Sequence, residues 1–300
     1  MAARFVSRIP MVTGTMLFPG LFDVWLTADQ VLRLLSGDSE DHAILLCCYL
    51  LKLGMKAWLL LGSGVPHGAT AYVLTKSSTA EYVLWDPPTG NKYSVLDSFC
   101  PLHKVFCLVN QDNIWANIQR EEVISRTRFD VTKRNDWWPA FGKIVSAPLD
   151  SVQPEALDYT VQPTFQTDAS LLQDKLEKLL RDSITRWRPT SRTIWNRYVT
   201  VTLRKLLPSL ESATWTNNSH LVKVEHYNQL SHSLGSHKMC GFPMNFVFTS
   251  IQDIIEAIKA TGIHSNENAD VEFALAVYIH TYPCNVISVW VYLASLLLRR

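Results

Sequence analysis

The side chains in the first third of the chain that could do chemistry are a serine, two histidines and a pair of cysteines. Ser39 lies in GDSEDHA, with His42 three residues later, and His67 stands in the turn before TAYVLT. A serine hydroxyl is a very weak acid, and a helix N-terminus, worth at most about 2 kcal/mol, cannot ionise it. Ser39 would therefore need a base, and the two histidines are the candidates. Cys47 and Cys48 lie inside the apolar run AILLCCYLL, which predicts core packing for both thiols.

The local pattern around these residues predicts a helix followed by three strands. The helix begins at Asp38 and ends before Gly54, and its acidic first turn suits the positive end of the helix dipole. The runs KAWLLLG, TAYVLT and EYVLWD then follow, separated by turn residues. KAWLLLG is apolar on both faces, which is typical of a central strand.

This order of elements resembles the core of papain-like and transglutaminase-like cysteine enzymes. In those enzymes the helix typically opens with G-D-C-E-D-[YH]-A, the catalytic histidine lies on the second strand, and an aspartate begins a D-P turn after the third. The resemblance places Ser39 where the cysteine belongs and Thr70 where the histidine belongs, and it keeps Asp86. A threonine cannot act as the base, and the aspartate then has no histidine to orient. We therefore predict a pseudoenzyme with three degenerate triad positions, no catalytic residue, no cofactor and no metal.

We expect the cleft of such a core to outlast the lost reaction. Its predicted lining, beyond the three degenerate positions, consists of Asp38, Glu40, His42, Trp58, His67, Tyr72 and Trp85. We do not expect either histidine to replace the missing base, because the family places that group on the strand. An active serine hydrolase or acyltransferase that uses Ser39 with one of them is the alternative from a different functional class.

The composition is that of a folded chain with balanced charge. The 300 residues are 47% hydrophobic and 18% charged, enough for a sizeable core in one or two domains. With 28 basic and 27 acidic residues, the net charge of +1 creates no field that attracts nucleic acid. The six cysteines include no C-x-x-C pair, so neither a zinc site nor a disulfide framework is predicted. We predict no transmembrane segment: VISVWVYLASLLL is shorter than the roughly 18–20 residues that span a bilayer and predicts a buried strand.

We predict an α+β fold in one composite domain over residues 21–300, preceded by a strand-like lead-in over residues 1–20. An irregular connection is expected over residues 130–166 and a helical hairpin insertion over residues 167–210. A strand-helix-strand-strand segment over residues 240–300 is expected to complete the same core. The run NIWANIQ predicts a helix or an irregular wall, and the polar, histidine-containing segment before GFPMN predicts a solvated loop.

Several longer motifs resemble one family over nearly the whole chain. They are GDSEDHAILLCCYLLKLGMKAWLLLG, FCPLHKVFCLVNQDNIWANIQ, GFPMN and VEFALAVYIHTYPCNVISVWVYLASL. The family is that of the coiled-coil and C2 domain-containing proteins, large scaffold proteins of the ciliary transition zone. The chain resembles the C-terminal region of these proteins, and it resembles the 2B paralogue more than the 2A paralogue. The C2 domain and coiled coils that precede this region in the family are not visible in this sequence.

The family resemblance implies an inactive transglutaminase-like domain related to one in a centrosomal protein. It implies a cytoplasmic location at the ciliary base, partners among the transition-zone complex proteins, and a role in cilium assembly. A retained cleft beside a sheet edge is suited to an extended peptide, such as a tubulin tail. We therefore expect a non-catalytic protein-binding scaffold module. Besides the serine hydrolase, a purely structural platform is the second alternative.

Overall fold

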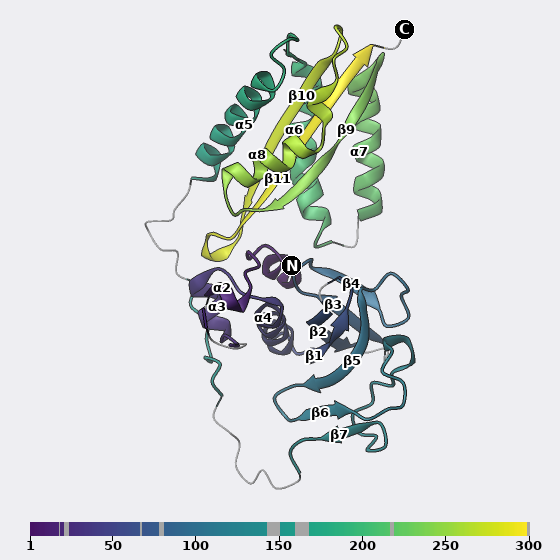
Figure 1. Ribbon diagram of the computed structural model, residues 1–300. Coiled ribbons are helices and arrows are strands. Elements are labelled where there is room, and N and C mark those ends of the chain that lie inside the picture. The colour runs from purple at the N-terminus through teal and green to yellow at the C-terminus, as the bar shows by residue number, and fades with distance from the viewer. Residues whose placement is uncertain are drawn as a thin grey trace. The chain divides into compact units, whose positions relative to one another are not determined.

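The computed structural model describes residues 1–17, 19–20, 24–66, 68–77, 81–142, 151–159, 168–216 and 219–298. The chain divides into two compact units, an N-terminal unit of residues 2–160 and a C-terminal unit of residues 161–300 (Figure 1). Each unit combines helices with its own largely antiparallel sheet. The predicted α+β class is therefore confirmed.

The N-terminal unit is built on a seven-stranded antiparallel sheet with the order β4-β3-β2-β1-β5-β6-β7. Its strands are β1 (Lys56–Gly64), β2 (Gly68–Lys76), β3 (Tyr82–Asp86), β4 (Asn91–Ser94), β5 (Leu102–Val109), β6 (Ile114–Asn117) and β7 (Trp137–Pro139). β1 lies in the middle of the sheet, as its continuous apolar run predicted. The run NIWANIQ forms β6, and our prediction of a helix or an irregular wall is wrong. Its backbone is paired by β5 on one side and β7 on the other, and this pairing outweighs the helical spacing of its apolar residues.

The helices of the N-terminal unit are α1 (Ala2–Val6), α2 (Gly14–Leu17), α3 (Ala28–Leu34), α4 (Ser39–Lys52) and the 3₁₀ helix η1 (Ile124–Arg126). α4 packs against β1 and β2. The lead-in differs from the predicted strand, because it contains α1. The ring of Phe5 in α1 lies 6.1 Å from that of Tyr49 in α4, centroid to centroid. The first residues are thus part of this unit rather than a separate lead-in.

Successive side chains on the central strands point to opposite faces of the sheet, and each face has its own apolar layer. The layer on one face includes Trp58, Leu60, Tyr72, Leu74, Leu84, Leu108, Phe129 and Trp137. The alternate residues of β1 and β2 on the other face are Ala57, Leu59, Ala71 and Val73, and they are also buried. The central strands are therefore covered on both faces, and only their ends can contribute to a cleft.

The C-terminal unit has a separate four-stranded sheet with the order β8-β10-β11-β9. Its strands are β8 (Ile194–Trp195), β9 (His237–Val247), β10 (Glu272–Thr281) and β11 (Ile287–Leu298). Its α-helices are α5 (Ala169–Arg186), α6 (Arg197–Ala213), α7 (Ser219–Leu234) and α8 (Ile251–Ala260). It also contains the 3₁₀ helices η3 (Ile263–Ser265) and η4 (Pro283–Asn285). The apolar run near the C-terminus forms β11, as predicted. Across the described part of the chain, no helix combines the length and apolar character needed to span a bilayer.

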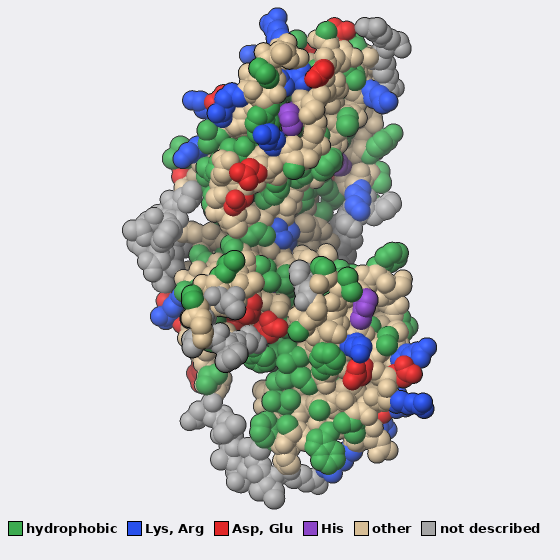
Figure 2. All heavy atoms as spheres, in the orientation of Figure 1, with side chains coloured by type: hydrophobic (Ala, Val, Ile, Leu, Met, Phe, Trp, Pro, Cys, Tyr) green, Lys and Arg blue, Asp and Glu red, His purple; other side chains and the backbone are tan. Residues whose placement is uncertain are grey.

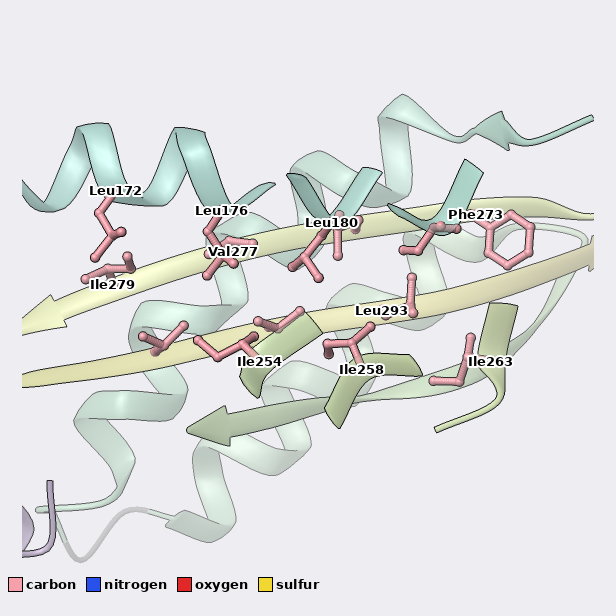
Figure 3. Packing of buried hydrophobic residues seen from close by; sticks show 14 of the residues in the cluster. Leu172, Leu176, Leu180, Ile254, Ile258, Ile263, Phe273, Val277, Ile279 and Leu293 are labelled. Atoms are coloured by element: carbon pink, nitrogen blue, oxygen red, sulfur yellow. The ribbon is translucent and has the colours of Figure 1, made fainter. Parts of the chain in front are cut away.

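Different helices cover the two faces of the hairpin formed by β10 and β11. Odd-numbered residues of the hairpin, such as Phe273, Val277, Ile279 and Leu293, pack with Leu172, Leu176 and Leu180 of α5 and with Ile254 and Ile258 of α8 (Figure 3). Even-numbered residues, Ala274, Ala276, Tyr292 and Leu296, pack with Val199, Leu203, Leu206 and Leu207 of α6 and Leu230 of α7. Since α5 and α6 lie on opposite faces, the helical hairpin predicted over residues 167–210 is wrong.

A buried carboxylate joins α6 to this hairpin. Glu211 is 1% exposed. Its carboxylate accepts hydrogen bonds from Tyr282 Oη at 2.5 Å, Ser288 Oγ at 2.8 Å and Trp290 Nε1 at 2.5 Å. Hydrogen bonds to an ionised acceptor are the stronger kind, so this residue is a main tie between helix and sheet.

The structure differs from the single composite domain predicted over residues 21–300. The strands of residues 240–300 do not join the seven-stranded sheet, but form a second sheet with separate apolar layers. Local pattern identifies a strand, whereas its pairing partners depend on contacts distant in sequence.

Two other segments also differ from their predictions. The histidine-containing segment forms α7 rather than a loop. The connection predicted over residues 130–166 contains β7. Within it, residues 151–159 contain neither helix nor strand, and residues 143–150 and 160–166 lie outside the described residues.

Candidate functional site

The candidate site begins at the N-terminus of α4. Asp38 is the N-cap, and its Oδ1 accepts from the Asp41 N–H at 3.0 Å, while Asp41 Oδ2 accepts from the Asp38 N–H at 3.2 Å. This reciprocal pair is a capping box. Asp41 Oδ1 also accepts from the Leu26 N–H at 2.7 Å, so one buried carboxylate joins α4 to the chain that enters α3. Ser39, the first residue of α4, is held in place by this network.

Gly37 allows the chain to approach this turn closely. A Cβ atom at Gly37 would lie 2.8 Å from Asp41 Cβ, closer than side-chain carbons pack. The Gly37 carbonyl accepts from the Val12 N–H at 2.9 Å. The segment after α1 therefore runs beside the start of α4.

Ser39, Thr70 and Asp86 line one cleft of about 590 Å³. Thr70 lies near the start of β2 and Asp86 ends β3. Ser39 Oγ donates to Glu40 Oε2 at 2.7 Å, and Thr89 Oγ1 donates to Asp86 Oδ2 at 2.7 Å. The structure thus brings together the three positions that the sequence singled out, although they are distant in sequence.

Of the further residues predicted to line the cleft, Asp38, Glu40 and Tyr72 do so. His42 is buried elsewhere, Trp58 and Trp85 also lie off the cleft, and His67 is outside the described residues. The prediction missed residues 11–14, residues 64–66 at the end of β1 and in the connection to β2, and Pro88, Thr89 and Pro101. The sequence predicts residues 1–20 as a lead-in ahead of the domain, and no motif in them indicates that residues 11–14 line the cleft.

The two tryptophans are displaced for reasons of strand geometry. Trp85 and Asp86 are successive residues of β3, so their side chains point to opposite faces of the sheet. Trp85 Nε1 donates to Thr75 Oγ1 at 3.0 Å on its own face. Trp58 pairs with Leu74 in the strand register. Leu74 is four residues along β2 from Thr70, a separation of about 13 Å at roughly 3.3 Å per residue.

His42 does not contact Ser39 as a base. Its Nδ1 lies 2.6 Å from the Asp38 carbonyl oxygen and its Nε2 lies 3.1 Å from the Ile9 carbonyl oxygen. Burial lowers the pKa of His42, against the opposing effect of these two carbonyls. Both ring nitrogens are occupied by backbone oxygens, so His42 fixes the segment after α1 to α4 instead of accepting the Ser39 proton.

Tyr72 brings a phenol side chain to the lining of the cleft. The residue is 4% exposed, and its hydroxyl has no hydrogen-bond partner among the described residues. Burial, followed by the charge of Asp86, raises the pKa of Tyr72. The phenol is therefore uncharged at neutral pH and can both donate and accept a hydrogen bond.

The cysteines of this unit do not supply a replacement nucleophile. Burial raises the pKa of the Cys47 thiol to about 12. Burial also raises the pKa of Cys100, which precedes the cleft residue Pro101. Nucleophilic cysteines need a lowered pKa, because the thiolate is the reactive form.

The charge of the cleft is negative. Asp38, Glu40 and Asp86 line it, and its described lining residues include no lysine or arginine. On the face shown in Figure 2, acidic side chains gather over the helical part of the N-terminal unit. Elsewhere on that face basic and acidic side chains are interspersed, in line with the balanced net charge of +1.

Two family models match the chain. The CEP76 peptidase-like domain matches residues 23–140, and the C-terminal domain of the centrosomal protein of 76 kDa matches residues 165–297. Over 98% of the chain, protein CC2D2B from Homo sapiens is 42% identical, and coiled-coil and C2 domain-containing protein 2A from Drosophila melanogaster is 35% identical. The chain belongs to the coiled-coil and C2 domain-containing protein family. The family inferred from the sequence motifs is thus confirmed, including the greater similarity to 2B than to 2A.

More distant relatives match the chain over the same span. The centrosomal protein of 76 kDa from Homo sapiens is 26% identical over 98% of the chain. The chain covers 20% of the length of CC2D2B, 22% of that of protein 2A and 48% of that of the centrosomal protein. Among solved structures, calcium-bound LapG from Legionella pneumophila is 17% identical with a TM-score of 0.33, covering 41% of this chain and 68% of its own. A likeness of that size carries no argument about this chain.

Proposed function

We propose that the N-terminal unit is a catalytically inactive papain-like or transglutaminase-like module that binds an extended segment of a partner protein. The observation that carries the proposal is the convergence of Ser39, Thr70 and Asp86 on one cleft. These are the positions of nucleophile, base and orienting carboxylate in the enzymes that the sequence resembles. With Thr70 at the position of the base, such a cleft keeps the shape of a peptide site but cannot carry out the reaction.

The contacts at the site support a binding role over an active hydrolase. The Ser39 hydroxyl donates to the Glu40 carboxylate, and a carboxylate is a poor base for a serine. His42 is directed at backbone carbonyls, and Thr70 cannot take up a proton. The Asp86 carboxylate accepts from Thr89, so it has a role in the turn that follows β3.

The size and lining of the cleft suit part of a peptide. Its volume of about 590 Å³ falls within the range of roughly 300–1,000 Å³ typical of ligand sites. Its lining includes the apolar side chains of Met11, Val12, Val65 and Pro66 and the phenol of Tyr72. Such a site can hold one or two side chains of an extended chain, while the rest lies on the surface.

We further propose that the protein acts as a scaffold module at the ciliary base, in the transition zone, and contributes to cilium assembly. Its partners would be other proteins of the transition-zone complex. Membership of the coiled-coil and C2 domain-containing family and the similarity to a centrosomal protein support this location. The C-terminal unit, with its own core, would serve as the second part of the scaffold.

Closing the cleft tests the binding role directly. Thr70→Trp places an indole in the cleft, whereas Leu53→Trp places the same group beyond the other end of α4, at an exposed position. Octapeptides displayed on phage are selected against the full chain and then measured against both variants. We expect Thr70→Trp to abolish binding of the selected peptides and Leu53→Trp to leave it unchanged.

The same variants separate the alternatives. A selection that yields no peptide, or peptides that bind both variants equally, would mean that the cleft is a relic on a structural platform. A fluorophosphonate probe provides the check for an enzyme, because it labels activated serines. We expect no labelling of Ser39, and labelling lost in Ser39→Ala would instead establish the hydrolase.

A further inference from the structure

We propose that the cleft selects a basic side chain, a lysine or an arginine of the bound segment, over an acidic one. This inference rests on the proposed peptide-binding function and specifies its ligand. It separates two kinds of partner that the cleft's shape alone does not distinguish: lysine- or arginine-containing segments and glutamate-rich tails such as those of tubulin.

The first argument is the charge of the lining. Asp38, Glu40 and Asp86 face the cleft from the start of α4 and from the end of β3. Among the lining residues that the structure describes, none is a lysine, arginine or histidine. Among the described lining residues, the charged side chains that an ammonium or guanidinium group would meet are carboxylates, which attract it and repel an acidic side chain.

The second argument is Tyr72, which is more than nine-tenths buried and lines the cleft. Its hydroxyl has no hydrogen-bond partner among the described residues, so it is available to hydrogen-bond a ligand in the cleft. An uncharged phenol oxygen accepts hydrogen bonds from an ammonium or guanidinium group. The ring adds an aromatic face, to which cations are attracted.

The third argument removes the main reason to expect an anion. A helix N-terminus offers free N–H groups and a partial positive charge, which together form an anion site. At α4, however, Asp38 accepts from the Asp41 N–H, and Asp41 accepts from the Asp38 N–H. Two carboxylates of the chain itself therefore already occupy the positive end of the helix.

Matched peptide pools test the selectivity on the full chain. Two fluorescein-labelled, end-blocked octapeptide pools differ only in the central position, which is lysine or arginine in one and glutamate or aspartate in the other. All remaining positions are uncharged. Binding is measured by fluorescence anisotropy at low and high salt, with Thr70→Trp as the closed-cleft reference.

We expect the basic pool to bind at least about tenfold more tightly than the acidic pool, and the binding to weaken with salt. Asp86→Asn and Glu40→Gln each remove one charge from the cleft and should weaken basic-pool binding by about tenfold, the scale of a charge-assisted hydrogen bond. Tyr72→Phe should weaken it without changing the charge. Glu81→Gln, an exposed residue outside the cleft lining, is the control and should have no effect.

Each other result counts against the inference in a distinct way. If the acidic pool binds as tightly as the basic pool and Thr70→Trp abolishes both, the selectivity is wrong and the binding function stands. If the basic pool binds Thr70→Trp as well as the parent, its site is elsewhere and the inference fails. If neither pool binds the folded chain, the proposed function fails together with this inference. Urea unfolding of each variant verifies that it is folded.

Discussion

Replacing Glu211 should unfold the C-terminal unit at much lower denaturant concentrations. Its carboxylate is 1% exposed and accepts hydrogen bonds from Tyr282, Ser288 and Trp290. Glu211→Ala removes the acceptor of these three hydrogen bonds, and a buried donor that loses its acceptor costs about 1–3 kcal/mol. Removing one partner of a buried charged interaction costs about 3–5 kcal/mol, and we expect a loss of that size in the free energy of unfolding.

Glu211→Gln should cost less, because the amide keeps one oxygen as an acceptor. Its NH₂ group, however, faces a donor, and the negative charge is lost, so we expect about 1–3 kcal/mol. Glu225→Ala on α7 is the matched control, since it removes an exposed carboxylate and should change stability by less than about 0.5 kcal/mol.

Urea unfolding combined with hydrogen exchange of peptides from β10 and β11 measures the loss within the C-terminal unit. Exchange resolves the two units, which matters because a two-unit chain need not unfold in one step. A loss below about 1 kcal/mol for Glu211→Ala would refute the argument that the three donors depend on this carboxylate. So would faster exchange confined to the N-terminal unit.

Three further outcomes follow from the N-terminal unit and the cysteines. Asp41→Ala removes the acceptor of the Leu26 and Asp38 N–H groups and should lower the unfolding free energy of this unit by about 2 kcal/mol in urea titrations. Since burial lowers the pKa of His42 in the folded chain, the unfolded chain binds a proton more readily. The unfolding midpoint should fall as the pH drops from about 7.5 to 5.5, below the ordinary histidine pKa of about 6.5, and His42→Gln should reduce that dependence. Iodoacetamide at about pH 8 should alkylate exposed Cys240 and spare Cys47, as mass spectrometry of the folded chain would show.

The sequence predicted well what depends on neighbouring residues. The acidic cap before α4, the apolar run that follows and the turn at Gly54 lie close together in the chain, so the helix and the three strands after it were predicted near their observed bounds. The strands β9, β10 and β11 were identified for the same reason, whereas β8 lies within the helical hairpin that the sequence predicted. The triad positions came from a motif, and motif spacing carries information about position even where the residue types have changed.

What the sequence missed depends on contacts between distant segments. The sheet that β10 joins depends on which strands pair with it, and a local sequence pattern does not identify those strands. α7 contains three serines and three histidines, residues of modest helix propensity, and it packs against α6 and β9. These contacts, rather than its own preference, account for the helix. Likewise, the residue type of His42 does not reveal that its ring turns toward the Ile9 carbonyl instead of the cleft.

The tie between Gly37 and the segment after α1 has a practical consequence for anyone who trims this protein. The peptidase-like family match begins at residue 23, which makes that residue a natural place to start a shortened chain. Such a chain would lack Met11, Val12, Thr13 and Gly14, and one side of the cleft would stand open to solvent. It would also lack the Val12 N–H that donates to the Gly37 carbonyl and the Ile9 carbonyl that contacts His42 Nε2. If a chain shortened in this way failed to bind peptides, the result would reflect an incomplete cleft and would not test the native one.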